Sequence, residues 1–406
     1  MHFTRVEQTA LPSEASRIYR QTMVRTNLDR AAHSRRYSDR VLFWLIILFF
    51  LVSAAALLTS RLMDLLGTGT WLYLWILINL SAVGISFVSR YFRNGFPTKT
   101  HLYVSRAASV WNIFILMTAP LLLLQKLADI AGFTSPPHPQ GVLFSLFFSF
   151  VFCAYSIYEA YTIHTVRIEI STERLPKEMR RLRIAQLSDL HLGPFMSPAQ
   201  LRRVLLTMEE SKPDLLVITG DLVDGDIRKH VREIALFRKY APPLGIYCVP
   251  GNHDYYENID HAVSFMERAG MHVLRTKVAE VGGIVIVGAD DQDHLFLLPD
   301  GQTHSQKLLD SLTSEQRKKF VLLLRHRPVV EPGTEGKFQL QLSGHTHGGQ
   351  VFPHPSSRHK IPGVHRGILS LKEGSLLYIN NGAGFVGPPM RFLAPPEITI
   401  IDLIHP

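Results

Sequence analysis

The sequence predicts two parts, a four-helix transmembrane region followed by an α/β domain. Four long apolar runs without a charged residue lie between residues 41 and 163. Beyond residue 180, strand-like runs alternate with helical patterns, and several of the strands end in Asp, Asn or His. The composition agrees with a membrane portion, because only 19% of the 406 residues are charged and 46% are hydrophobic.

Each apolar run is long enough, or nearly so, to cross a hydrocarbon core of about 30 Å as a helix. Buried helices of a soluble domain are the alternative, but such helices rarely lack charge all round over this length. The runs contain no Asp, Glu, Lys or Arg, which argues against a small transporter with a regulatory domain. They are Val41–Ser60, Leu65–Ser89, Ala107–Gln125 and Gly141–Tyr158.

The distribution of Lys and Arg predicts the orientation of this region. Segment 1–40 carries eight, the three loops carry one, four and one, and six follow the fourth run. Because Lys and Arg favour the cytoplasmic side, the pattern places both ends in the cytoplasm. We therefore expect a basic cytoplasmic segment 1–40 and a multi-pass region 41–163 in the inner (cytoplasmic) membrane. Ser34-Arg35-Arg36 resembles an export signal, but three further apolar runs follow and favour the positive-inside interpretation.

The net charge of +9 has two explanations. A basic domain near the cytoplasmic leaflet attracts anionic lipids, which makes membrane lipids an expected partner. Nucleic acid binding is the rival, but the chain shows no basic stripe interleaved with aromatic residues. We expect no nucleic acid partner.

The border between the two parts lies in residues 164–182, which we interpret as a stalk or linker ahead of a domain at 183–406. Val166 to Ile170 alternates between apolar and polar residues, so it is either a stalk or the first strand of that domain. Helical patterns follow at Pro198–Ser211, Asp226–Tyr240 and Ala262–Ala269.

Five blocks of potential metal ligands each follow a strand-like run. Open α/β sheets place their sites at the carboxyl ends of strands, so these blocks are expected to meet. A lone His or Asp at a strand end is usually a turn former or a cap, whereas five blocks in order form a specific signal. The blocks are Asp189-Leu190-His191, Gly220-Asp221-Leu222-Val223-Asp224, Gly251-Asn252-His253-Asp254, His326-Arg327-Pro328 and Gly344-His345-Thr346-His347-Gly348-Gly349.

The donor types in these blocks indicate the metals. Carboxylate oxygens, an amide oxygen and imidazole nitrogens suit manganese, iron or zinc, and no thiolate is present to favour softer ions. We expect two divalent ions, with manganese favoured, if one carboxylate bridges them.

With these blocks, residues from about 180 to 403 resemble the calcineurin-like metallophosphoesterases. The resemblance implies a four-layer αββα sandwich and two metals that activate a bridging water for attack on phosphorus. It also implies that His253 stabilises the transition state or protonates the leaving oxygen while Asp224 orients its ring. The implied ligands are Asp189, His191, Asp221 and His347 for the first ion, and Asp221, Asn252, His326 and His345 for the second.

The C-terminal stretch narrows the resemblance. Asn380–Gly384, Pro388–Arg391 and Pro396–Ile400 are similar to the membrane-associated bacterial branch of the family. That branch includes phosphodiesterases and the UDP-diacylglucosamine pyrophosphatase of lipid A synthesis. Arg391 is a candidate substrate-binding residue, because its planar fork suits phosphate. An arginine that pins a loop is the alternative.

We therefore predict a membrane-anchored, metal-dependent phosphoric ester hydrolase on the cytoplasmic surface. Its expected substrate is a lipid-linked phosphodiester or pyrophosphate. A general phosphodiesterase or phosphatase acting on soluble substrates is the enzymatic alternative. A membrane signalling protein with a regulatory phosphoesterase-like domain is the alternative from another class, and the complete ligand set argues against it.

Overall fold

The computed structural model describes residues 51–406 except 64–65, 68, 92–98, 134–138, 194–195, 225–226, 228–230, 292–301 and 351–365. These residues group into two compact units that meet in the sequence between Tyr158 and Glu159. The predicted basic segment 1–40, with its Arg35-Arg36 pair, and the start of the first apolar run lie outside the described residues.

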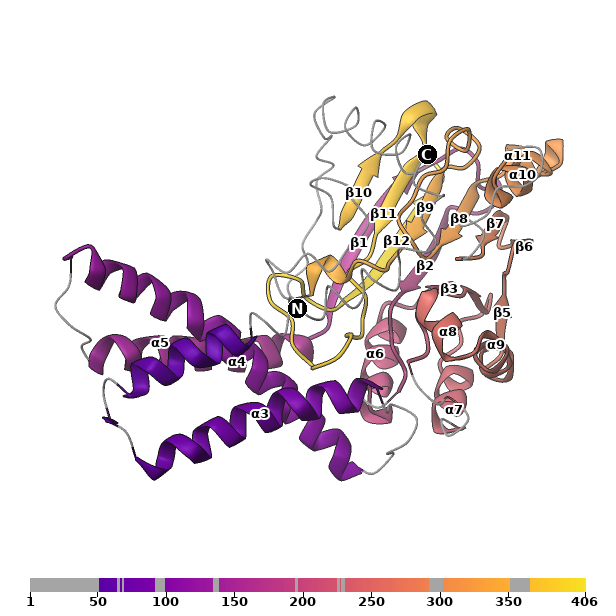
Figure 1. Ribbon diagram of the computed structural model, residues 1–406. Coiled ribbons are helices and arrows are strands. Elements are labelled where there is room, and N and C mark those ends of the chain that lie inside the picture. Colours follow the sequence, from indigo (N-terminus) through magenta and orange to yellow (C-terminus); the bar gives the residue numbers. More distant parts are fainter. Residues whose placement is uncertain are drawn as a thin grey trace. The chain divides into compact units, whose positions relative to one another are not determined.

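The first unit is helical (Figure 1). Among the described residues, two helices are long and apolar enough to cross a membrane, as judged by length and composition: Tyr103–Ile130 and Pro139–Ala160. The described residues also include two shorter apolar helices, Leu51–Met63 and Thr70–Ile85, while residues 41–50 of the first predicted run lie outside the described residues. Within the described part of the chain, two candidate spans are thus found where the sequence predicted four. The labelled helices are α3 (Thr70–Tyr91), α4 (Lys99–Ile130) and α5 (Pro139–Ala160).

Inside the helical unit, a small apolar cluster forms around Leu58, Ile115 and Leu122. Polar contacts join the helices beside it: Trp75 Nε1 donates to Thr59 Oγ1 at 2.8 Å, and Arg61 pairs with Asp129 at 2.9 Å. Many large apolar side chains face outward instead, among them Phe147, which is 66% exposed. An outward-facing apolar surface of this kind is typical of helices that meet lipid or another protein.

The second unit contains two six-stranded mixed sheets, so the α/β prediction is confirmed. In the first sheet the order is β1-β12-β2-β3-β4-β5, and β2 to β5 run parallel. Its strands are β1 (His164–Ser171), β2 (Arg181–Leu187), β3 (Leu215–Thr219), β4 (Ile246–Val249), β5 (Met271–Val273) and β12 (Glu397–Ile404).

The second sheet has the order β10-β11-β9-β8-β7-β6, with β7, β8, β9 and β11 parallel. Successive strand residues point to opposite faces of a sheet. Both faces of each sheet carry apolar side chains that pack into cores. The strands are β6 (Lys277–Val281), β7 (Ile284–Ala289), β8 (Val321–Arg325), β9 (Leu340–Ser343), β10 (Gly367–Ser370) and β11 (Leu376–Ile379).

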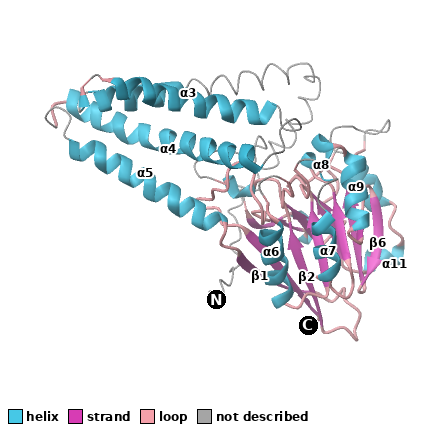
Figure 2. Cartoon of the chain, turned by 90° about the horizontal axis from the view of Figure 1, so that it is seen from below, coloured by secondary structure: helices cyan, strands magenta, loops and turns pink. Residues whose placement is uncertain are grey.

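This unit has four layers in the order helices, first sheet, second sheet, helix. Three apolar cores lie between the layers. Ile184 and Val217 of the first sheet pack with Leu322 and Leu342 of the second in the central core. On the outer face of the first sheet lie α6 (Pro198–Glu210), α7 (Val231–Lys239) and α9 (Ile259–Arg268), as Figure 2 shows for α6 and α7. Helix α10 (His304–Asp310) packs on the outer face of the second sheet through Leu309. The short helices α8 (Asn252–Glu257) and α11 (Ser314–Lys318) complete the unit.

The predicted linker at 164–182 is corrected by the structure. Residues 164–171 form β1, which pairs in parallel with β12 over its whole length. The alternation from Val166 to Ile170 is that of a strand, because Ile168 and Ile170 pack against the central core. Only residues 161–163 separate the end of α5 from the start of β1. The α/β unit thus begins about 20 residues earlier than the sequence prediction placed it.

Candidate metal centre

The five ligand blocks lie at the carboxyl ends of five strands. Asp189 and His191 follow β2, Asp221 and Asp224 follow β3, and Asn252 and His253 follow β4 in the first sheet. In the second sheet, His326 follows β8, and His345 and His347 follow β9. The strands that carry the blocks are parallel within each sheet. Each sheet therefore presents its blocks at one edge, which the carboxyl ends of these strands form.

The backbone at these positions is strained. Asp189, His191, Asp221, His345 and His347 have φ values of 52°, 48°, 50°, 72° and 51°. Non-glycine residues seldom adopt this left-handed region, which costs on the order of 1–3 kcal/mol each and concentrates at functional sites. The strained backbone therefore lowers the stability of the fold while it directs these five side chains toward the site.

Two glycines allow the blocks to approach one another. A Cβ on Gly344 would lie 1.9 Å from Ser188 Oγ and 2.2 Å from Asp189 Oδ2. On Gly251 it would lie 2.3 Å from Asp221 Oδ1. Any side chain at these positions would push the blocks apart, so glycine is required here for close approach.

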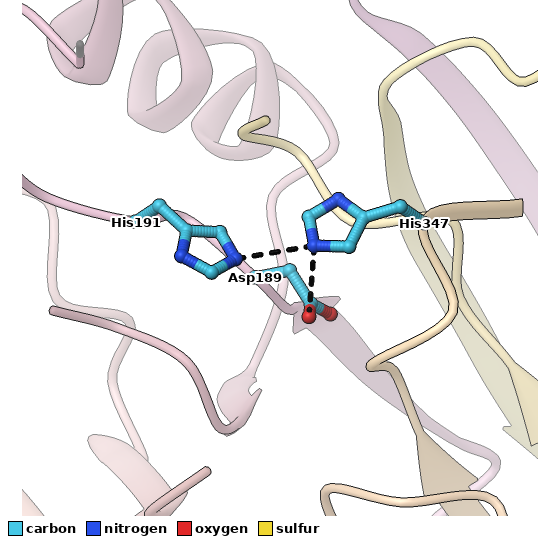
Figure 3. Close-up of side chains that lie close together, drawn as sticks. All are labelled: Asp189, His191 and His347. Atoms are coloured by element: carbon cyan, nitrogen blue, oxygen red, sulfur yellow. Dashed lines mark hydrogen bonds and ion pairs between the residues drawn. The ribbon is translucent and has the colours of Figure 1, made fainter. Parts of the chain in front are cut away.

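Asp189, His191 and His347 converge in a first cluster (Figure 3). The Nε2 atoms of His191 and His347 lie 3.1 Å apart, and His347 Nε2 is 3.4 Å from Asp189 Oδ1. All three side chains are buried. Two imidazole nitrogens and a carboxylate oxygen aimed at one point form a donor set that fits a divalent ion.

Asp221, His326 and His345 converge in a second cluster. His326 Nε2 lies 3.3 Å from Asp221 Oδ2, 3.0 Å from His345 Nδ1 and 3.2 Å from the amide oxygen of Asn252. Asp221 also approaches the first cluster, since its Oδ2 is 3.7 Å from His191 Nε2. Asp221 is therefore the carboxylate that both clusters share.

Contacts behind the clusters fix the direction of the donors. His326 Nδ1 donates to the backbone carbonyl of Thr219 at 2.8 Å, which leaves the lone pair on Nε2 facing the cluster. The backbone N–H of His345 donates to both oxygens of Asp189, at 2.9 and 3.1 Å. Ser188 Oγ donates to Asp189 Oδ2 at 2.5 Å.

Burial and mutual charge shift the protonation equilibria strongly. Burial raises the pKa of Asp189 to about 6 and lowers that of His191 to about 4. Burial acts to raise the pKa of Asp221 as well, but the facing imidazoles of His326 and His253 hold it well below its usual value. Burial acts to lower the pKa of His326, but the Asp221 carboxylate outweighs this and raises it to about 10. The Asp221 carboxylate thus favours positive charge at the second cluster, as a proton on His326 or as a metal ion in its place.

His253 and Asp224 form a pair at the edge of the first cluster. His253 Nδ1 lies 3.1 Å from Asp224 Oδ1, and the His253 side chain keeps 18% of its surface exposed. The His253 ring lies edge-on to His191, with ring centroids 4.7 Å apart. On another side, the ring centroid of the exposed Tyr256 lies 5.4 Å from that of His253, so His253 stands at the partly exposed rim of the first cluster.

Arg391 contacts backbone carbonyls beside the first cluster. Its side chain is fully buried, and its Nη1 donates to the backbone carbonyls of His347 at 2.8 Å and Asn381 at 2.9 Å. Its Nη2 lies 3.2 Å from His347 Nδ1 and donates to the carbonyl of Gly384. Burial lowers the pKa of Arg391 to about 10. The alternative role, an arginine that pins a loop, describes what the structure shows.

Sequence reasoning missed three carboxylates beside the site. Asp254 accepts the backbone N–H groups of Gly251 at 2.8 Å and Val223 at 2.9 Å, and so ties two ligand blocks together. The signal for Asp254 in the sequence was its position at the end of the third ligand block. Asp290 and Asp291 follow β7, and the signal for them was again their place after a strand.

Known proteins are similar to this chain in sequence. The calcineurin-like phosphoesterase family model matches residues 182–349. An uncharacterized metallophosphoesterase of Aquifex aeolicus is 36% identical over 260 residues, which are 64% of this chain and 98% of that protein. The chain belongs to the calcineurin-like phosphoesterase family. The family's YkuE protein of Bacillus subtilis, also an uncharacterized metallophosphoesterase, is 34% identical over 60% of this chain and 87% of its own.

Two further metallophosphoesterases are similar over other lengths. A Danio rerio transmembrane protein with metallophosphoesterase domain is 32% identical over 59% of this chain and 56% of its own. A Helicobacter pylori metallophosphoesterase is 26% identical over 89% of this chain and 97% of its own. Among solved structures, a dimetal phosphatase from Danio rerio has a TM-score of 0.32 and 13% identity over 50% of this chain and 87% of its own, a likeness too low to add to the assignment.

Proposed function

We propose that this protein is a membrane-anchored, dinuclear-metal phosphoesterase that hydrolyses a phosphodiester or pyrophosphate bond. The observation that carries the proposal is the pair of largely buried donor clusters that both approach Asp221, in a chain of the calcineurin-like phosphoesterase family. Two clusters with one common carboxylate are the arrangement that a two-metal hydrolase needs.

Each ion has four ligands in this proposal. Asp189, His191 and His347 would hold the first ion, and Asn252, His326 and His345 would hold the second. Asp221 contributes to both. The ions, with manganese favoured, supply Lewis acidity that activates water and neutralises phosphoryl charge.

His253 carries the proton chemistry on the chain's side. Asp224 accepts the Nδ1–H of His253 and so holds the ring with Nε2 toward the rim. Nε2–H then protonates the leaving oxygen as its bond to phosphorus breaks. Arg391 is proposed to act through the loop it pins, because its donors serve backbone carbonyls rather than the rim.

The favoured substrate is lipid-linked, for two reasons. The outward-facing apolar side chains of α3 and α5 suit a bilayer, and one relative is named a transmembrane protein. The connection of residues 161–163 is short, so it limits how far the α/β unit diffuses from the end of α5. Tethering of this kind raises the effective concentration of a lipid-borne phosphate over that of a soluble one.

The orientation proposed is that of a multi-pass protein in the inner (cytoplasmic) membrane, with the α/β unit in the cytoplasm. The positive charge that follows the last apolar run supports it. With the two candidate spans Tyr103–Ile130 and Pro139–Ala160, reporter fusions after Ile130 and at Pro406 are expected to report the outside and the cytoplasm. An external signal from the fusion at Pro406 would support the export interpretation of Arg35-Arg36.

The substrate proposal is tested by comparing two substrates that share one head group. The full-length protein, loaded with Mn²⁺, is assayed on a lipid-linked phosphodiester or pyrophosphate in mixed micelles and on its water-soluble analogue. We expect a higher kcat/KM for the lipid-linked substrate. Equal values would remove the lipid substrate and leave a tethered general phosphodiesterase. Hydrolysis of neither would favour a signalling protein.

A further inference from the structure

An adjacent pair of buried carboxylates, Asp290 and Asp291, follows β7 and belongs to neither donor cluster. Asp290 is 4% exposed and Asp291 is 2% exposed. Each faces an arginine: Asp290 Oδ2 lies 2.8 Å from Arg275 Nε, and Asp291 Oδ1 lies 2.9 Å from Arg327 Nε. Burying two neighbouring carboxylates is costly unless both are paired, so these ion pairs explain how the two can lie side by side.

Asp291 holds the segment that carries His326. Arg327 directly follows His326 in the chain, and its Nε donates to both oxygens of Asp291, at 2.9 and 3.1 Å. On the other side, the His326 ring is held by its bond to the carbonyl of Thr219. The backbone of His326 is therefore fixed by Asp291 and its ring by β3.

Asp290 holds the helix that carries Asn252. Its two oxygens accept from the Tyr255 hydroxyl and from Arg275 Nε, and Arg275 Nη2 donates to the Tyr255 oxygen at 3.0 Å. The three side chains thus close a triangle. Tyr255 lies on α8, three residues after Asn252 and two after His253. A short helix of this length has little stability of its own, so the triangle sets its position.

The two carboxylates join parts of the second cluster that come from different sheets. Asn252 follows β4 of the first sheet, whereas His326 follows β8 of the second. We propose that Asp290 and Asp291 are positioning residues that set the separation of Asn252 and His326, and with it the affinity of the second metal site. This inference rests on the ligand assignment of the proposed function.

The first cluster does not depend on these carboxylates. Asp189 is held by Ser188 and by the backbone of His345, and His347 lies against Arg391. Loss of Asp290 or Asp291 should therefore weaken one metal site and spare the other. A general loss of folding would weaken both.

The test measures Mn²⁺ binding by calorimetry on the full-length protein, without substrate. The variants are Asp290→Ala and Asp291→Ala, and we expect one site of wild-type affinity and a second weakened by about 10- to 100-fold, as for other residues that orient metal ligands. Tyr255→Phe and Arg327→Lys remove single contacts with little change in volume. They should weaken the same site by a smaller factor, which keeps the test decisive if an alanine variant fails to fold.

Asp402→Ala is the matched control. Asp402 makes a similar two-oxygen pair with Arg183, at 2.7 and 2.9 Å, at the opposite end of β2 from Asp189. We expect a lower melting temperature and unchanged Mn²⁺ affinities. Wild-type affinities in all four site variants, or an equal shift in Asp402→Ala, would overturn the positioning role. A protein that binds two Mn²⁺ ions as expected but cleaves no phosphoester would refute the proposed function alone.

Discussion

The Asp221→Asn variant is expected to lose hydrolysis and most of its bound metal while keeping its fold. The Asp221 carboxylate lies close to both clusters, 3.7 Å from His191 Nε2 and 3.3 Å from His326 Nε2. Asparagine keeps the size and one oxygen, which preserves the bond from the His253 backbone N–H, but it removes the charge that attracts cations. Activity assays, elemental analysis and circular dichroism of the purified variant measure hydrolysis, bound metal and fold in turn.

The control for this variant is Asp310→Asn. Asp310 pairs with Lys337 at 2.5 Å on the surface, so its neutralisation changes net charge equally without touching the clusters. This control should keep full activity and metal content. An Asp221→Asn protein with the same metal content as the control, and full activity, would contradict the assignment of a shared carboxylate.

The second large effect is expected for His253→Ala. Removing a general acid costs on the order of 10²- to 10⁴-fold in kcat, and the loss should shrink for substrates whose leaving groups need less protonation. Metal content should stay at the wild-type value, because His253 is proposed to donate a proton and not to bind a metal ion. Steady-state kinetics on a leaving-group series, with metal analysis of the same preparation, separates the two roles.

His272→Ala provides the comparison for His253. His272 stacks on Tyr247, with ring centroids 4.7 Å apart, and lies on β5 outside the ligand blocks. The His272→Ala variant should have wild-type kcat and metal content. Loss of metal from His253→Ala would instead make His253 a ligand, which its proximity to His191 and Asp221 also permits geometrically.

The site residues were predictable from the sequence because their signals are local. Each ligand follows a strand by one to a few residues, so a strand pattern and a residue type together locate it. The loops also carry glycines where backbones must approach, such as Gly251 and Gly344. The left-handed backbone of His345 and His347, in contrast, has no signal in residue type, because it follows from the packing of the loop.

The remaining features depend on contacts between distant segments. Arg391 was a plausible phosphate ligand from its chemistry, but the carbonyls that surround it come from residues 347 and 381–384 and become visible only in three dimensions. The linker prediction failed because β1 pairs with β12, more than 200 residues later in the chain. Apolar runs predict spans by composition, and among the described residues two candidate spans are found where four were predicted.

Counting the ions in the wild-type protein tests the central claim most directly. Anomalous scattering from crystals of the Mn²⁺-loaded protein should show two peaks about 3.5–4 Å apart, with the Asp221 carboxylate in contact with both. One peak, or two peaks that do not share Asp221, would contradict a dinuclear site.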